Sequence, residues 1–209
     1  MAMHFLAFEG LDGAGKSTLI QGLGRELEAR GQASVITREP GGSALGEAVR
    51  KLLLTVDGEA PVPRAEALLY QAVRAQHVDK LIRPTLMAKK WVLCDRYAAS
   101  SLAFQSGGRE ISEQQIQWLN NFSTGNLQPD LYILLDLPVD ESLKRLNSRG
   151  QDTDRFEREH RGFHERVRSA YIQQAHAKPE QWCVLSATEA PATLLNNLMR
   201  ELKNRTWLN

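Results

Sequence analysis

The chain is poor in cysteine, lacks a long apolar run and carries almost no excess of either charge. Its two cysteines, Cys94 and Cys183, cannot build a disulfide framework, and both stand in apolar runs that predict buried free thiols. With 26 basic and 25 acidic side chains, the net charge of +1 gives no global reason to expect a nucleic acid or an anionic membrane as partner. No window approaches about 18 apolar residues, and no basic segment followed by an apolar stretch is found near residue 1. Membrane spanning and secretion are therefore disfavoured, and a cytoplasmic location is expected.

Length and composition predict one globular domain. The chain has 209 residues, of which 42% are hydrophobic and 24% charged, and this balance excludes a disordered protein. One domain over residues 1–209 fits this length better than two. The sequence has no internal repeat, no low-complexity tract and no long linker of Pro, Gly and Ser.

Apolar patterning predicts strands that alternate with helices. The expected strands are five nearly continuous apolar runs: Phe5–Phe8, Ser34–Thr37, Trp91–Cys94, Leu131–Leu137 and Trp182–Leu185. Helical spacing of leucine is found at residues 19–27 with Gly31 as the cap, at 45–53, from 68 onward with a kink at Pro84, and at 194–202. Continuous apolar strands are covered on both faces, so the alternation predicts an α/β fold with a parallel sheet and right-handed crossovers.

The strongest motif is a glycine-rich loop between the first expected strand and the first expected helix. Residues 10–17 satisfy the pattern Gly-x-x-x-x-Gly-Lys-Ser, whose glycines let several backbone N–H groups converge on a phosphate at a helix N-terminus. Lys16 is placed to reach the β- and γ-phosphates of ATP, and the Ser17 hydroxyl to ligate Mg²⁺. The predicted ATP-binding residues of the loop are Gly10, Leu11, Asp12, Gly13, Ala14, Gly15, Lys16, Ser17 and Thr18.

A second candidate lies after the third expected strand, where Asp95, Arg96 and Tyr97 follow an apolar run. An acid there can organise the waters around Mg²⁺, and the adjacent arginine can hold a phosphate by a bidentate fork. A surface ion pair is the alternative for these two residues alone. Beside the phosphate loop they become candidate catalytic residues, together with Lys16. The Asn-Lys-x-Asp sequence that reads guanine in GTPases is absent, which favours a small-molecule kinase over a nucleotide-binding switch.

The ordered set of motifs resembles bacterial thymidylate kinases. The set comprises the phosphate loop, the segment Thr37-Arg38-Glu39-Pro40-Gly41-Gly42 and the segment Asp95-Arg96-Tyr97. The resemblance covers nearly the whole chain. It implies the P-loop nucleoside monophosphate kinase fold, a five-stranded parallel sheet flanked by helices, and a homodimer. It also implies ATP-dependent, Mg²⁺-assisted phosphorylation of dTMP to dTDP. Another monophosphate kinase with a different acceptor stays open as the alternative.

The resemblance implies a phosphate and sugar site for dTMP. Asp12 matches the acidic loop residue that accepts a hydrogen bond from the sugar 3′-hydroxyl. Arg50 and Arg96 match the arginines that grip the acceptor phosphate, where two guanidinium forks neutralise a dianion. Arg38 and Glu39 match the loop beside that phosphate.

The resemblance also implies the contacts of the base and of the sugar ring. Tyr70 aligns with the aromatic residue that stacks on thymine, and Arg74, four residues on, aligns with the donor to the base O4. Ser101 matches the small polar residue facing the pyrimidine N3 edge, and Gln105 belongs to the same segment. Phe104 stands where relatives often carry Tyr against the sugar 2′ carbon, so its effect there is steric.

The stretch from Lys144 to Arg168 has the densest charge and predicts a lid, placed at residues 145–157. A basic lid stabilises charge on the transferred phosphoryl group and excludes water. The family divides by whether the catalytic arginine lies in the phosphate loop or in the lid. Because the loop offers Gly13 and Ala14 here, the resemblance assigns that role to Arg149 and Arg155, with Arg145 near adenine. His160 and His164 are four residues apart, and solvent exposure on a charged helix is expected for both rather than a metal site.

Overall fold

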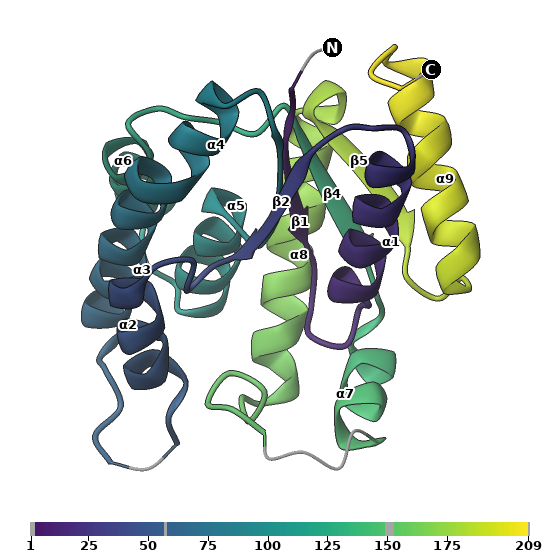
Figure 1. Ribbon diagram of the computed structural model, residues 1–209. Helices are drawn as coiled ribbons and strands as arrows, with labels where there is room; N and C mark the ends of the chain where they lie inside the picture. The colour runs from purple at the N-terminus through teal and green to yellow at the C-terminus, as the bar shows by residue number, and fades with distance from the viewer. Residues whose placement is uncertain (1–2, 57, 149–152, 209) are drawn as a thin grey trace.

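A central parallel sheet organises the structure, a computed structural model that describes residues 3–56, 58–148 and 153–208 (Figure 1). The strands are β1 (Phe5–Glu9), β2 (Ser34–Arg38), β3 (Trp91–Asp95), β4 (Leu131–Asp136) and β5 (Trp182–Ser186). They lie in the order β2-β3-β1-β4-β5, and each neighbouring pair is parallel. The predicted parallel sheet is therefore confirmed, with every strand beginning at the predicted residue and ending within one residue of the predicted end.

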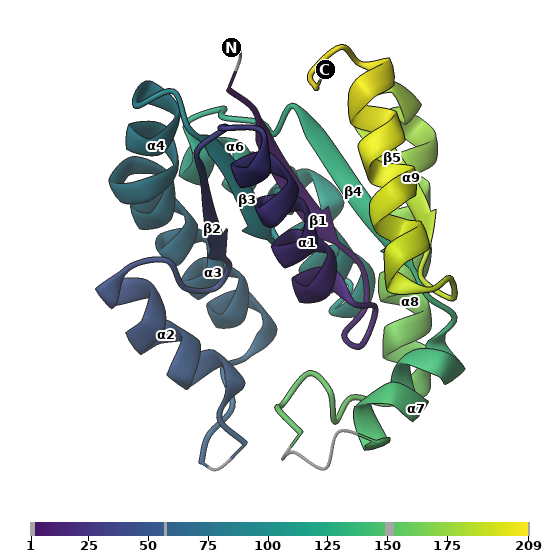
Figure 2. The ribbon, with the colours of Figure 1, turned by 45° about the vertical axis from the view of Figure 1, so that its right-hand side comes forward.

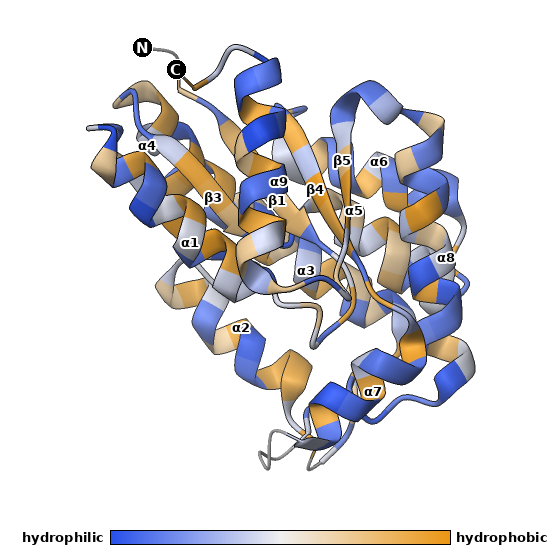
Figure 3. Cartoon of the chain, turned by 90° about the vertical axis from the view of Figure 1, so that its right-hand side faces the viewer, coloured by the Kyte–Doolittle hydropathy of each residue, from blue (hydrophilic) through white to orange (hydrophobic). Residues whose placement is uncertain are grey.

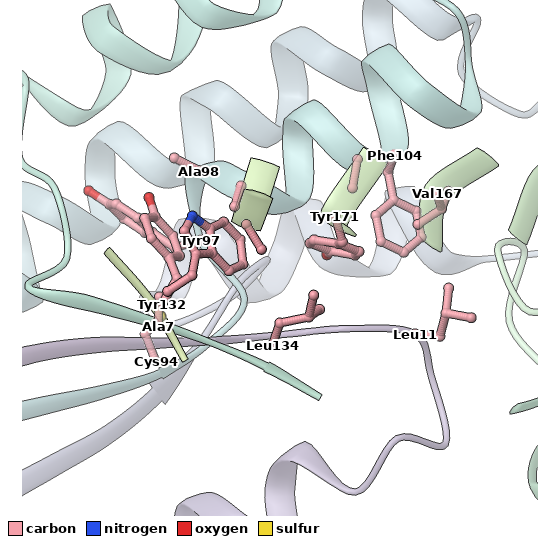
Figure 4. Packing of buried hydrophobic residues seen from close by; sticks show 14 of the residues in the cluster. Ala7, Leu11, Cys94, Tyr97, Ala98, Phe104, Tyr132, Leu134, Val167 and Tyr171 are labelled. Atoms are coloured by element: carbon pink, nitrogen blue, oxygen red, sulfur yellow. The ribbon is translucent and has the colours of Figure 1, made fainter. Parts of the chain in front are cut away.

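Two apolar layers sandwich the sheet because successive side chains of each strand point to opposite faces. On β1, Leu6 and Phe8 pack against α1 (Lys16–Ala29) and α9 (Pro191–Asn204). Phe5 and Ala7 face the other layer, which includes α5 (Ala98–Ser101) and α8 (Arg161–Ala177). Figure 2 shows α1 and α9 together on one side of the sheet. In Figure 4, Phe104, Val167 and Tyr171 lie across from Leu11 and Leu134 in the second layer.

The remaining elements connect the strands, and those that directly precede a strand lie near its amino end. They are α2 (Ala44–Leu54), α3 (Pro63–His77), a π-helical segment (Val78–Ile82), α4 (Arg83–Met87), a second π-helical segment (Leu102–Gly108), α6 (Glu113–Thr124), α7 (Val139–Ser148) and a 3₁₀ turn (Pro179–Gln181). Figure 2 shows α2 and α7 on either side of the loop that follows β1. β2 and β3 lie on one side of β1, and β4 and β5 lie on the other, so the strand order reverses at β1. In such folds, ligands bind at this point, beyond the carboxyl ends of the strands.

The helix predictions hold in part. Gly31 follows α1 with a left-handed φ of 67°, as expected for the cap. The helix expected from residue 68 begins earlier, at Pro63, and the irregularity expected at Pro84 lies at Val78–Ile82. Pro84 has no N–H to donate to the carbonyl four residues earlier, that of Lys80. Lys80 lies within this π-helical segment, so the missing hydrogen bond accounts for the irregularity.

The charged stretch from Lys144 to Arg168 is not a lid throughout, which corrects the sequence expectation. α7 runs to Ser148, and α8 begins at Arg161 and buries Phe163 and Val167 in the core. Figure 3 shows α7 as mostly hydrophilic, whereas β1, β3 and β4 are mostly hydrophobic. Within the described residues, no helix is both long enough and apolar enough to cross a membrane. Cys94 is buried as predicted, whereas Cys183 is half-buried, and both are free.

Candidate active site

The glycine-rich loop turns sharply between β1 and α1. Gly10 has a φ of 132°, and a Cβ atom there would lie 2.4 Å from the carbonyl oxygen of Leu135, so only glycine fits. Gly15 precedes α1 with a φ of 92°, and no side chain among the described residues caps this helix. The N–H groups of the first turn of α1 are therefore available to an anion.

Lys16 begins α1, and its ammonium lies inside the loop. Nζ donates to the carbonyl oxygens of Gly10 (3.2 Å) and Leu11 (3.0 Å) and lies 3.8 Å from Asp12 Oδ1. Burial lowers the pKa of Lys16, and the positive charge of Arg96 lowers it further, whereas Asp12 acts in the opposite sense. An incoming polyphosphate would favour the charged form of this buried ammonium.

Ser17 and Asp95, the two predicted magnesium ligands, lie next to each other. The Ser17 hydroxyl donates to Asp95 Oδ2 at 3.2 Å, which joins the start of α1 to the end of β3. Hydroxyl and carboxylate oxygens are ligands that suit Mg²⁺. Within the described residues, no cluster of three or more His, Cys, Asp or Glu side chains could hold a metal ion.

Arg96 connects the phosphate loop to the end of β3. Nη2 donates to Asp12 Oδ1 at 2.6 Å and Nη1 to the Gly10 carbonyl at 3.0 Å. The guanidinium carbon lies 5.0 Å from the centre of the Phe104 ring. Although burial works against the charged form, the Asp12 carboxylate and other nearby acids hold the pKa of Arg96 well above its usual value. Arg96 is therefore a fixed cation at the boundary of the loop.

A pocket beside Arg96 brings together residues from six separate segments of the chain. Of the ten predicted dTMP-binding residues, all but Arg38 line it. The lining residues are Asp12, Glu39, Pro40, Arg50, Leu54, Tyr70, Arg74, Arg96, Ser100, Ser101, Phe104, Gln105, Asp154 and Phe156. Arg50 is half-buried and donates to the Pro40 carbonyl at 2.9 Å, whereas Arg38 is exposed and pairs with Glu47 at 3.0 Å.

Arg74 is a buried residue that lines this pocket and contacts several neighbours. Its Nε donates to Glu39 Oε2 at 2.7 Å and its Nη2 to the Tyr97 carbonyl at 3.0 Å. Nη1 lies within hydrogen-bond distance of Gln71, Ser101 and Asn120. A guanidinium has five N–H donors. Among the described residues, no acceptor contacts the second Nη2 hydrogen of Arg74, which is therefore available to a ligand.

Glu39 holds the Arg74 guanidinium in place and is itself held by His77. Its other oxygen, Oε1, lies 3.0 Å from His77 Nδ1, and His77 Nε2 lies 2.8 Å from Thr37 Oγ1. Burial acts to raise the pKa of Glu39, but Arg74 and His77 together hold it below its usual value. Glu39 lines the pocket, and the printed sequence offers no signal for its His77 partner, 38 residues away.

Aromatic rings form one wall of the pocket. The Phe156 ring packs edge to face against Tyr70 (6.2 Å between ring centres) and Phe104 (5.7 Å). Burial raises the pKa of the Tyr70 hydroxyl, and the negative charge of Glu66 raises it further. Phe156 and Asp154 line the pocket but were not predicted as acceptor residues, because the sequence places them only within the lid.

The described part of the predicted lid is docked against α2 and α3. Arg155 donates from Nη2 to Glu66 Oε2 at 2.7 Å and from Nε to the Leu53 carbonyl at 3.0 Å. Glu66 is fully buried and also accepts from Gln105 Nε2 at 2.9 Å. Arg149, the other predicted lid arginine, lies outside the described residues. Arg145 is on α7 and donates to the carbonyls of Gly13 and Ala187, beside the phosphate loop.

His164 is buried, which corrects the expected exposure of both histidines. Only 4% of its surface is exposed, whereas His160 is exposed and caps α8 by accepting from the Phe163 N–H. Burial lowers the pKa of His164. His164 follows the buried Phe163 on α8, so its position on the packed side of the helix explains the difference.

The sequence is similar to known proteins over nearly its whole length. The profile of the family described as Thymidylate kinase matches residues 8–197. The thymidylate kinase of Bdellovibrio bacteriovorus is 51% identical over 210 residues, which cover 99% of this chain and 98% of that protein. The chain belongs to the thymidylate kinase family. The thymidylate kinase of Desulfovibrio desulfuricans is 47% identical over 193 residues, covering 90% of this chain and 89% of the relative.

A solved thymidylate kinase has the same fold. The crystal structure of the enzyme from Ehrlichia chaffeensis superposes with a TM-score of 0.78 at 29% identity and covers 97% of this chain and 99% of that chain. The resemblance inferred from the phosphate loop, residues 37–42 and residues 95–97 is thus confirmed. The chain has the P-loop nucleoside monophosphate kinase fold of thymidylate kinases.

Proposed function

We propose that the chain transfers the γ-phosphoryl group of ATP to dTMP and releases dTDP. The observation that carries this proposal is the contact between Asp12, in the phosphate loop, and Arg96, in the acceptor pocket. This contact supports a triphosphate site and a monophosphate site that lie side by side, as direct transfer between two nucleotides requires. The family assignment supports dTMP as the acceptor.

Transfer needs no covalent intermediate on the protein, because positioning and charge neutralisation supply most of the rate in phosphoryl transfer. Lys16 and the loop N–H groups would hold the β- and γ-phosphates. Ser17 and Asp95 would hold Mg²⁺, partly through water, and the bound ion would neutralise charge on those phosphates. Arg50 and Arg96 would hold the dTMP phosphate close to the γ-phosphoryl group.

The lid completes the site in this proposal. Asp154 and Phe156 line the acceptor pocket. The guanidinium of Arg155 would have to leave its hydrogen bonds to Glu66 and the Leu53 carbonyl to reach a substrate. We propose that Arg155, with Arg149, supplies positive charge to the transferred group when ATP is bound, and that Arg145 contacts the nucleotide beside Gly13. The rest of the lid segment would exclude water from the pocket.

The pocket predicts a preference among bases and sugars. The free Nη2 hydrogen of Arg74 suits the thymine O4, whereas cytosine presents an amino donor there, so that donor would face donor. An unpaired buried donor costs about 1–3 kcal/mol and a charged one more, so dCMP should fall at least about tenfold below dTMP in kcat/KM. Ribose should be disfavoured because Phe104 would crowd its 2′-hydroxyl. The loss of the thymine methyl group costs roughly 1 kcal/mol, so dUMP should be a weaker but measurable substrate.

A steady-state assay with ATP, Mg²⁺ and a panel of acceptors tests the proposal. The panel contains dTMP, dUMP, UMP, dCMP, CMP and thymidine, and chromatography identifies the product. Formation of dTDP with dTMP as the best acceptor supports the proposal. A preference for CMP or dCMP would assign the pocket to another monophosphate kinase. ATP hydrolysis without transfer to any acceptor would favour a nucleotide-binding switch.

We also propose a homodimer, for which α6 offers a surface. Trp118 and Phe122 are 64% and 75% exposed, and their rings stack with centres 5.7 Å apart and planes 9° apart. A second copy of the chain would bury this apolar pair. Sedimentation equilibrium should give twice the mass of one chain, and Trp118→Glu should shift the protein towards the monomer. A monomeric wild-type protein at micromolar concentration would contradict the proposal.

The free thiols and the substrates support a cytoplasmic location for this enzyme. Cys94 and Cys183 form no disulfide in the structure, as in proteins of reducing compartments. ATP and dTMP are the partners that the proposal requires, and neither a nucleic acid nor a membrane is proposed.

A further inference from the structure

A buried carboxylate lies directly behind the phosphate site. Glu9 ends β1, one residue before the phosphate loop begins at Gly10, and its side chain is fully buried. Oε1 accepts from the Tyr97 backbone N–H at 2.9 Å. Oε2 accepts from the Ser100 hydroxyl at 2.6 Å and from the Tyr171 hydroxyl at 2.9 Å. None of these contacts makes Glu9 a neighbour of a substrate, and neither its position nor its partners were predicted from the sequence.

The same two hydroxyls contact Arg96 on their other side. Arg96 Nη1 lies 3.1 Å from the Tyr171 hydroxyl oxygen and 3.5 Å from Ser100 Oγ. The two hydroxyl oxygens are 2.7 Å apart. A chain of hydrogen bonds can therefore run from the Arg96 guanidinium through the hydroxyls to Glu9, with every proton pointing towards the carboxylate. Hydrogen bonds aligned in this way polarise and strengthen one another.

The backbone around Arg96 also depends on this carboxylate. Arg96 has a left-handed φ of 71°, which is unfavourable for a residue with a side chain and needs support from its surroundings. The Arg96 N–H is bonded to the Phe8 carbonyl, and the next N–H along the chain, that of Tyr97, is bonded to Glu9. Consecutive residues of β1 thus hold the backbone of Arg96 and Tyr97 in place.

We propose that Glu9 is a positioning residue that orients Arg96 towards the acceptor phosphate through Ser100 and Tyr171. The inference rests on the proposed function, since it concerns the group that grips the dTMP phosphate. It follows from the polarity of the contacts, because all three partners of Glu9 are donors. An ionised carboxylate accepts on both oxygens, whereas the amide of glutamine has a donor at one end. Glutamine at this position would set an N–H against either the Tyr97 N–H or the hydroxyls.

The burial of Glu9 is itself unfavourable for stability. Burial raises the pKa of Glu9, while Ser100 and Arg96 act in the opposite sense, so folding disfavours the charged form. Apolar residues can often replace buried ionic groups without loss of stability. A carboxyl group kept at such a position next to a binding site is a candidate for a functional role.

The test compares Glu9→Gln and Tyr171→Phe with the wild-type enzyme. Each variant keeps the shape of the side chain and breaks the hydrogen-bond chain at one link. Because a hydrogen bond to a charged group is affected, Glu9→Gln should raise the KM for dTMP about tenfold or more. The KM for ATP should change less than about twofold, since the phosphate loop has its own contacts. Tyr171→Phe should give a smaller effect of the same kind, and the double variant should be no worse than Glu9→Gln alone.

The matched control is Tyr132→Phe, which removes another largely buried hydroxyl, one that contacts Gln128 and not Arg96. It should leave both KM values unchanged. An unchanged KM for dTMP in Glu9→Gln and Tyr171→Phe would overturn the inference. Equal increases in both KM values, together with a lower Tm, would also overturn it, because they would indicate a purely structural role. If Glu9→Gln does not fold, Tyr171→Phe alone decides by the same two criteria.

Different experimental results would contradict this inference and the proposed function. If the wild-type enzyme produces dTDP and the variants keep its KM for dTMP, the function stands and the role of Glu9 is wrong. If the wild-type enzyme produces no dTDP from dTMP, the proposed function is wrong, and with it the inference that depends on it.

Discussion

Substitution of Lys16 by alanine should reduce kcat at least about a thousandfold and leave the fold intact. The ammonium lies inside the phosphate loop, bonded to the carbonyl oxygens of Gly10 and Leu11, where its charge would act on the β- and γ-phosphates. Steady-state kinetics at saturating ATP and dTMP measures the loss. The KM for dTMP should change little, since Lys16 does not line the acceptor pocket.

The stability of this variant provides an internal check. The folded-state pKa of Lys16 lies below its unfolded value, so folding disfavours the charged side chain at neutral pH. This penalty begins to fall as pH rises through the lowered pKa and is gone above the unfolded pKa. Lys16→Ala should therefore have a Tm no lower than that of the wild-type protein without nucleotide. Lys203→Ala, on the exposed side of α9, is the matched control and should keep full activity. Near-normal turnover in a folded Lys16→Ala variant would rule out phosphate-loop chemistry.

Arg155→Ala should lower kcat by about 10²- to 10³-fold, with smaller changes in either KM. The proposal gives Arg155 a contact with the transferred phosphoryl group only during transfer, so its loss should raise the barrier more than it weakens binding. In the structure its guanidinium is held by Glu66 and the Leu53 carbonyl, beside the acceptor pocket. Steady-state kinetics with each substrate varied in turn separates kcat from the two KM values.

Two further variants sharpen this prediction. Arg155→Lys keeps the charge and should recover part of the lost kcat, although not the geometry of the guanidinium fork. Arg158→Ala removes an exposed arginine of the same segment, which donates to Thr153, and should have near wild-type kinetics. If Arg155→Ala raised only the KM for dTMP and kept kcat, Arg155 would hold the lid on the pocket and would not act on the transferred group.

Local patterns predicted the elements that form from local interactions. The five apolar runs predicted the strands to within one residue, because each strand is covered on both faces and so lacks polar interruptions. A charged helix was expected around His160 and His164, but the buried side of α8 was not predicted. Charged residues surround its apolar stripe of Phe163, Val167 and Tyr171, although these three recur every four positions. α6 was missed because two of its large aromatic residues, Trp118 and Phe122, are exposed, so apolar residues do not mark its buried side.

The site divides along similar lines. The motifs and the family resemblance name the candidate substrate-binding residues, and nine of the ten predicted acceptor residues line one pocket. Residues that act through others could not be predicted. Glu9 meets Tyr171 across 162 positions and Arg155 meets Glu66 across 89, and no local pattern encodes such contacts. His77, which supports Glu39, was missed for the same reason.

A competition between dTMP and dCMP tests the central claim most directly. Equal concentrations of the two nucleotides are incubated with the wild-type enzyme, ATP and Mg²⁺, and the ratio of dTDP to dCDP at low conversion gives the ratio of their kcat/KM values. The account predicts at least about ten dTDP for each dCDP, because Arg74 offers a donor that suits the thymine O4 and opposes the cytosine amino group. A ratio of one or less would contradict the assignment of the acceptor pocket to dTMP.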